Sequence, residues 1–261
     1  MLTRRTLLAS ASAGMALGTL ARLSHAAPAT LGSLTPRRLA LVIGNAIYDG
    51  EKPLPHVPAD AKLMADTLKT LDFAVRPIAD ANSADLAAAF RDWLVEGRKA
   101  DVRAVYYAGH GMELGGSIWL LPAREPVPAL SDLQNRAFNL SEVIASASAY
   151  AQGVTLVFYD ACRTSPLHSG KAAIPPAVRT RPPSGVLVAY AAMAGQFVSD
   201  GRDGQSPFAR ALARHLQQTD QAIEDALKQV ASDVQDATKR RQQPVFMSSL
   251  TGRFCVRPGR C

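Results

Sequence analysis

The chain has 261 residues, of which 48% are hydrophobic and 20% charged, a composition that is typical of a globular protein and excludes a disordered one. The formal net charge is +7, but the first 26 residues hold three arginines and no acids, so the remaining chain carries +7 − 3 = +4. A surplus this small and scattered argues against a nucleic-acid-binding protein.

The N-terminus has the pattern of an export signal. Arg4 and Arg5 precede a mild run of Ala, Gly and Leu, and small residues up to Ala26 suit a cleavage site. The pattern predicts a twin-arginine signal peptide over residues 1–26, a linker over 27–36, and a periplasmic or extracellular protein. The apolar run is short for a membrane span, so we expect no stable membrane insertion after signal removal, with an uncleaved anchor as the alternative.

Strands and helices then alternate along the first half of the chain. Apolar runs predict strands, and residues at helical spacing predict helices. The expected strands cover residues 38–45, 74–79 and 102–108, and the expected helices cover 59–73, 83–97 and 139–150. Ser83 is predicted to cap the second helix, and residues 117–122 are expected to form an antiparallel ribbon.

The second half repeats this order. Strands are expected over 154–160 and 185–192, helices over 206–218 and 222–234, and an edge strand over 244–249. Ser206 is the expected N-cap of the helix over 206–218. Fully apolar strands separated by helices predict an α/β fold with a mostly parallel sheet covered on both faces.

A histidine between two glycines follows the strand at 102–108, in the stretch AVYYAGHGMELGG. Gly109 and Gly111 would begin a dinucleotide-binding fingerprint, but Leu114 occupies the position of its third glycine. The next residues include Pro122 and give no sign of a helix that would direct its N-terminus at a phosphate. His110 is therefore better explained as a catalytic group.

Its expected partner is Cys162, which follows the strand at 154–160. In an open α/β sheet, ligands bind beyond the carboxyl ends of the strands, so neighbouring strands would bring His110 and Cys162 to one rim. A thiol beside an imidazole base is the arrangement that nucleophilic hydrolysis needs. The backbone N–H groups of Gly111 and Cys162 would hold the oxyanion, and a missing Cβ at Gly111 would leave room for a substrate carbonyl.

The other two cysteines, Cys255 and Cys261, lie close to the C-terminus with Pro258 and Gly259 between them. A turn there would bring them together, and an exported protein would permit the bridge. Both a disulfide and two free thiols are compatible with the sequence.

Five segments resemble the caspase/metacaspase family of cysteine peptidases, in its bacterial caspase-like branch. They are RLALVIGNAIY, PADAKLMADTLKTLDFAV, YYAGHG, VFYDACRTSP and DGRDGQSPFARAL, in the order of the family. The resemblance implies a caspase-like three-layer sandwich with a mostly parallel six-stranded sheet. The peptidase domain is expected over residues 37–254, followed by a tail over 255–261.

The resemblance also implies a specificity. Asp160 stands where caspases have glutamine and metacaspases have aspartate, in the pocket for the residue before the cut bond, so Arg or Lys is expected there. Asp200 would add negative charge. Residues 163–199 contain no Asp or Glu, whereas Lys171, Arg179 and Arg181 lie in the proline-rich loop, so self-cleavage in that loop would require a basic specificity.

Two rival functions stay open at this point. One is a caspase-like domain that binds partners or scaffolds a pathway without cutting, and the other is a peptidase that cuts after aspartate, against which Asp160 argues by charge repulsion. The expected partner is a peptide or protein substrate, with no nucleic acid. We expect neither a cofactor nor a metal site, although some metacaspases need calcium, and the sequence leaves calcium dependence and oligomeric state open.

Overall fold

The computed structural model describes residues 36–114, 117–126, 132–149, 153–161, 182–193, 196, 198–199, 201 and 204–257. These residues belong to a compact unit that spans Pro36–Cys261. The predicted signal peptide, Cys162, Asp200 and the three basic residues of the proline-rich loop lie outside the described residues.

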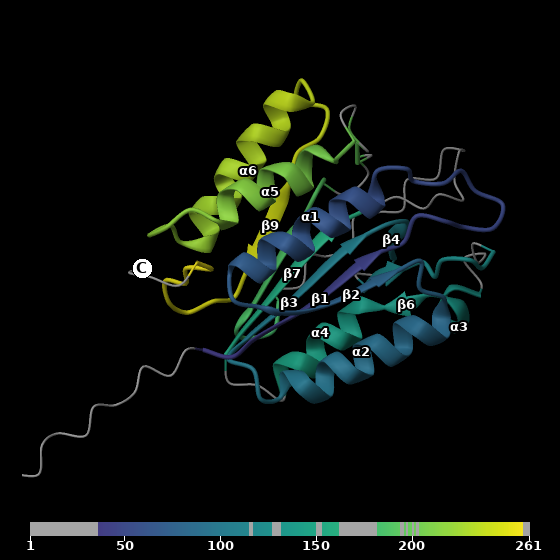
Figure 1. The fold of residues 1–261 in the computed structure, drawn as a ribbon, viewed down its shortest axis with the longest axis horizontal. Coiled ribbons are helices and arrows are strands. Elements are labelled where there is room, and N and C mark those ends of the chain that lie inside the picture. The colour runs from purple at the N-terminus through teal and green to yellow at the C-terminus, as the bar shows by residue number, and fades with distance from the viewer. Residues whose placement is uncertain are drawn as a thin grey trace, which may run out of the picture. The chain divides into compact units, whose positions relative to one another are not determined.

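A six-stranded sheet forms the centre of this unit, with strand order β2-β1-β3-β7-β8-β9 (Figure 1). Its strands are β1 (Arg38–Gly44), β2 (Ala74–Ala79), β3 (Val102–Ala108), β7 (Val154–Asp160), β8 (Val186–Tyr190) and β9 (Val245–Ser248). The first five are parallel and β9 runs antiparallel to β8 at the edge. The predicted α/β fold with a mostly parallel sheet is confirmed.

The burial of each strand explains its composition. Every residue of β1 and β3 is buried, as a strand covered on both faces by helices requires, and both strands are continuous apolar runs apart from Arg38 and Arg103. β2 lies at the opposite edge from β9 and is partly exposed. Pro77 is tolerated there because an edge strand has one side that needs no ladder hydrogen bond.

Helices cover both faces of the sheet. On one face lie α1 (Val57–Thr70), α5 (Pro207–Leu216) and α6 (Ile223–Ala237), and on the other lie α2 (Ser83–Gly97) and α4 (Leu140–Ala149), as Figure 1 shows. Two clusters of buried apolar side chains fill the layers between helices and sheet. The helices and strands therefore form three layers, as expected.

The helix caps agree with the prediction in one case and differ in the other. Ser206 caps α5, since its hydroxyl accepts from the Ala209 N–H at 2.9 Å. The cap of α2 is Asn82 and not Ser83, because Asn82 and Asp85 form a reciprocal capping box that fixes the first turn one residue earlier.

A small antiparallel sheet lies beside the end of β3. It consists of β4 (Gly111–Leu114), β5 (Ser117–Leu120) and β6 (Phe138–Asn139), and the short helix α3 (Leu133–Arg136) precedes β6. The ribbon expected around residues 117–122 is thus present, whereas the sequence analysis did not predict its partner β4. Glycine is uncommon in strands, so the glycine-rich stretch around His110 did not give the sequence pattern of a strand.

Two further features bear on the sequence predictions. Cys255 is disulfide-bonded. Both other cysteines lie outside the described residues, so the Cys255–Cys261 pairing stays a prediction. A search of the described ranges for helices long and apolar enough to cross a bilayer returned none.

Candidate functional site at the ends of β3 and β7

The sheet register places the strand ends that precede the two predicted catalytic residues side by side. β3 and β7 are parallel neighbours in which Ala108 lies opposite Asp160. His110 and Cys162 are each two residues beyond this pair in the sequence. Neighbouring strands lie about 4.8 Å apart, so both strands deliver their following residues to one rim. The adjacency that the sequence analysis assumed is present, although Cys162 itself is not described.

Three contacts hold the main chain of His110. Its N–H donates to the Tyr48 hydroxyl at 2.7 Å, and its carbonyl accepts from the Tyr107 hydroxyl at 2.5 Å. The same carbonyl accepts from the Leu121 N–H at 3.1 Å. The turn that carries the histidine is therefore fixed at both of its peptide groups.

These tyrosines also explain the glycines beside His110. Gly109 has φ 154°, and a Cβ there would lie 2.6 Å from the Tyr48 hydroxyl and 2.8 Å from the Tyr107 hydroxyl. A Cβ at Gly111 would overlap the hydroxyl of Tyr159. The sequence analysis attributed the bare position at Gly111 to an approaching substrate carbonyl. The structure gives another reason, which is that protein side chains already occupy the space.

The N–H of Gly111 points away from the small sheet. Gly111 pairs with Leu120 in the antiparallel ladder, and the preceding pair, His110 with Leu121, is hydrogen-bonded. Hydrogen-bonded and non-hydrogen-bonded pairs alternate in such a ladder, so the Gly111–Leu120 pair is of the second kind. Its N–H group is directed away from β5, as an oxyanion donor would need.

The imidazole of His110 is half-buried and packs against Tyr48, with ring centroids 4.5 Å apart and an interplanar angle of 49°. Burial lowers the pKa of His110, and the charge of Glu51 opposes this shift to a smaller extent. The ring is therefore more readily neutral near pH 7 than a free histidine, and a neutral imidazole is the form that accepts a proton.

A small cavity of about 70 Å³ adjoins His110. Its lining comes from the ends of β3 and β7, the first turn of α1, the start of α5 and the segment before it. The lining residues are Leu54, Val57, Asp60, Ala108, Gly109, His110, Asp160, Ala161, Val198, Ser199 and Ser206. The structure thus brings the predicted pocket residue Asp160 and the predicted base His110 to one cavity.

Two buried carboxylates, Asp60 and Asp160, belong to this cavity, with 1% and 5% of their surfaces exposed. Ser206 connects them, because its N–H donates to Asp60 Oδ1 at 2.8 Å and its hydroxyl donates to Asp160 Oδ2 at 2.7 Å. The Tyr106 hydroxyl also donates to Asp160 Oδ2, at 2.9 Å. Burial, followed by the charges of Asp160 and Asp60, raises the pKa of Tyr106 well above its usual range, which keeps this donor protonated.

The sequence analysis missed Asp60. The residue lies in the first turn of α1, and its position shares the buried stripe of that helix with Val57, Met64 and Leu68. A carboxylate on an otherwise apolar helical stripe is the signal that would have identified it, because a charge is rarely placed there without a specific role. The other polar residues of the helix made this pattern hard to recognise in the sequence.

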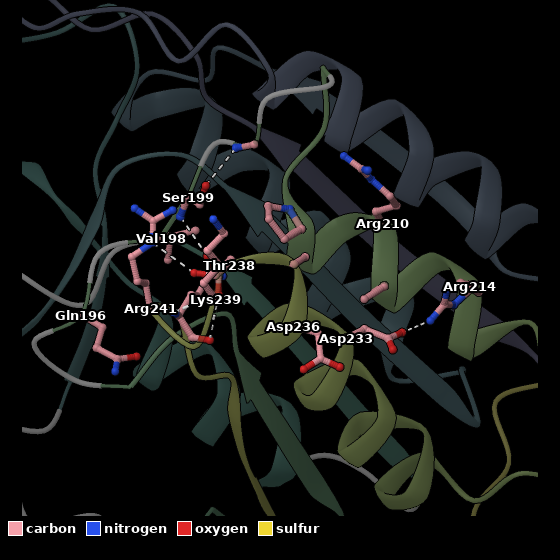
Figure 2. Close-up of a pocket in the computed structure, with 15 residues that line it drawn as sticks. Gln196, Val198, Ser199, Arg210, Arg214, Asp233, Asp236, Thr238, Lys239 and Arg241 are labelled. Atoms are coloured by element: carbon pink, nitrogen blue, oxygen red, sulfur yellow. Dashed lines mark hydrogen bonds and ion pairs between the residues drawn. The ribbon is translucent and has the colours of Figure 1, made fainter.

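A second cavity, of about 950 Å³, shares Val198 and Ser199 with the first. It lies along α5, α6 and the residues that follow α6. Its charged lining residues are Arg210, Arg214, Asp233, Asp236, Lys239 and Arg241, of which Arg214 and Asp233 form an ion pair, as Figure 2 shows. Buried Gln242 holds the Ser199 N–H at 2.9 Å, so this segment is fixed between the two cavities.

The comparisons with known proteins agree with this geometry. The caspase domain family matches residues 37–255. The chain belongs to the caspase domain family. It is 26% identical over 130 residues to the human and mouse forms of mucosa-associated lymphoid tissue lymphoma translocation protein 1, and this match covers 50% of the chain but only 15% of either relative.

A solved structure shares the fold over most of its length. Caspase-1 from Spodoptera frugiperda superposes with a TM-score of 0.62 at 18% identity, covering 85% of this chain and 90% of that one. The caspase-like fold predicted from the resemblance is therefore confirmed, and the family is one of peptidases.

The described part of the chain contains no group of three or more His, Cys, Asp or Glu side chains arranged to hold a metal ion. These residues therefore offer no candidate calcium site, and whether the protein depends on calcium stays open.

Proposed function

We propose that this protein is an exported cysteine endopeptidase that cleaves peptide bonds after Arg or Lys. One observation carries the proposal: a cavity that contains two buried carboxylates adjoins the histidine that follows β3. A peptide that places a basic side chain in this cavity would present its next peptide bond to the rim at which β3 and β7 end.

In the reaction, His110 accepts the thiol proton of Cys162, and the thiolate attacks the scissile carbonyl carbon. The N–H groups of Gly111 and Cys162 donate to the oxyanion, for which the Gly111 N–H is suitably directed away from β5. When the carbon–nitrogen bond breaks, His110 gives the proton to the leaving amine. Water, deprotonated by His110, then releases the acyl group from Cys162.

The charge of the cavity supports the choice of substrate. Asp60 and Asp160 give the cavity its acidic lining, and the hydrogen bonds described above reach them from neutral donors. A guanidinium or ammonium group is its electrostatic complement, and an aspartate side chain would be repelled. Asp200, predicted to add negative charge, follows Ser199 of the cavity lining in the sequence.

The remaining parts of the proposal rest on the sequence. The twin-arginine signal over residues 1–26 directs the folded protein to the periplasm or the exterior. No cofactor takes part in the steps above. Residues that flank the basic side chain enter the larger cavity, which shares the lining residues Val198 and Ser199 with the first.

The test uses two reporter peptides that differ only in having Arg or Asp before the cut bond. The protein is residues 27–261, assayed with and without calcium and beside the Cys162→Ala variant. We expect cleavage after Arg only, and none by the variant. Cleavage after Asp would contradict the assigned specificity. Cleavage of neither peptide would favour a caspase-like domain that binds partners without cutting.

A further inference from the structure

Tyrosine hydroxyls surround the turn that carries His110, and the reaction scheme above gives them no part. We propose that Tyr48 and Tyr107 are positioning residues that hold His110 by the two ends of its main chain and so set the direction of its imidazole. The kinetic side of the proposal rests on the proposed function, whereas the titration below does not.

The contacts form a connected network. The Tyr48 hydroxyl accepts from the His110 N–H at 2.7 Å and donates to the Asn45 carbonyl at 3.1 Å. The Tyr107 hydroxyl donates to the His110 carbonyl at 2.5 Å and lies 3.5 Å from the Tyr48 hydroxyl. Two side chains, one following β1 and one on β3, thus bind the histidine from different elements.

Burial keeps this network in a single protonation state. Tyr48 is 4% exposed, and Tyr107 and Asn45 are fully buried. Burial raises the pKa of Tyr48 to about 12 and that of Tyr107 well above its usual range. Both hydroxyls therefore stay protonated over the pH range in which His110 titrates, and their hydrogen bonds to its main chain do not change there.

The local sequence explains why the turn needs these two hydrogen bonds. His110 stands between two glycines, the residue type that leaves the main chain freest to move. A catalytic side chain must be held within about 0.5 Å of its productive position, and a turn flanked by glycines does not ensure this by itself. The tyrosines restrict the turn, and the glycines in turn leave the space that the hydroxyls occupy.

The neighbouring tyrosine on β3 offers a matched comparison. Tyr106 and Tyr107 are adjacent and point to opposite faces of the sheet, as successive strand residues do. The Tyr106 hydroxyl donates to the cavity carboxylate of Asp160, whereas the Tyr107 hydroxyl donates to His110. Removing one hydroxyl from each should therefore affect different kinetic constants.

The kinetic test compares single Tyr→Phe variants, each of which loses one hydroxyl and keeps its ring. For Tyr48→Phe and Tyr107→Phe we expect kcat for the Arg reporter to fall about tenfold, equivalent to about 1.4 kcal/mol, with little change in KM. For Tyr106→Phe we expect KM to rise and kcat to change little. The wild type, assayed beside the variants, is the reference for both constants.

The second test needs no peptidase activity. In the Cys162→Ala background of residues 27–261, the His110 proton resonance is titrated by NMR, with the other three histidines as internal references. We expect Tyr48→Phe to raise the His110 pKa toward its ordinary value, because a looser turn exposes the ring to water. If Tyr48→Phe does not fold, Tyr107→Phe provides the same test, because it removes the hydrogen bond to the His110 carbonyl. The proposal is overturned if the folded variants leave both kcat and the His110 pKa at their wild-type values within experimental error.

Discussion

The site has an acidic half around Asp160 and a histidine half around His110. Hydroxyl groups bind in both halves, but they bind different partners. In the acidic half, the hydroxyls of Tyr106 and Ser206 donate to the Asp160 carboxylate. In the histidine half, the hydroxyls of Tyr48 and Tyr107 bind the peptide groups on either side of His110. The first arrangement holds a carboxylate in a cavity, and the second holds the main chain of a turn. We therefore expect changes of charge in the acidic half to alter substrate binding, and changes of geometry in the histidine half to alter kcat.

The largest effect should come from removing the base. We expect His110→Ala to lower kcat for the Arg reporter by about a thousandfold, within the range for a general acid–base group, with KM little altered. Steady-state kinetics gives both constants, and a melting curve shows that the variant is folded. A kcat within tenfold of the wild type would exclude His110 as the base.

The next effect concerns the charge of the cavity. Asp160→Asn keeps the size of the side chain and removes its charge, so we expect kcat/KM for the Arg reporter to fall about a hundredfold, mainly through KM. A reporter with Leu before the cut bond is the control and should lose little. Equal losses for both reporters would indicate that Asp160 maintains the structure and does not select the substrate.

Asp60 tests whether both carboxylates contribute. We expect Asp60→Asn to lower kcat/KM for the Arg reporter about tenfold, because Asp160 still provides one charge. The two changes should be non-additive, since Ser206 connects the two side chains and both would face one basic group. A double-mutant cycle measures this coupling, and strict additivity would show that the carboxylates act separately.

Ser206 links the cavity to the stability of the fold. We expect Ser206→Ala to lower the free energy of unfolding by about 1–2 kcal/mol, because α5 loses its cap and Asp160 loses a donor. Asn82→Ala is the matched control, since it removes the cap of α2, which covers the opposite face of the sheet from α1 and α5 (Figure 1). Denaturant unfolding should show losses for both variants, whereas only Ser206→Ala should weaken cleavage of the Arg reporter.

The smallest effect concerns pH. Burial lowers the pKa of His110 in the folded state, so the unfolded chain binds a proton more readily at this position. The contribution of His110 to stability is therefore lost as the pH falls below its unfolded value of about 6.5 and through its folded value. Melting temperatures at pH 7.5 and 5.5 should fall less for His110→Asn than for the wild type, both carrying Cys162→Ala. An equal fall would contradict this role of His110.

The sequence indicated the fold well where one segment alone carries the signal. The strands at 74–79, 102–108 and 154–160 have the bounds expected from their apolar runs. It failed where the signal depends on a contact between two residues or strands and not on one segment alone. β4 was missed because its strand character comes from pairing with β5, and the cap of α2 was displaced because Asn82 and Asp85 act as a pair.

For the site, the sequence by itself determined which chemical groups follow each strand. His110 between two glycines after β3, and Asp160 and Cys162 at the end of β7, are local features, and the resemblance to a peptidase family rests on them. Only the tertiary structure decided what surrounds these groups. Asp60 lies in the cavity because α1 packs beside β1 and β3, and Tyr48 reaches His110 across 62 positions of the chain. Such contacts follow from the packing of whole elements, which no local pattern of residues encodes.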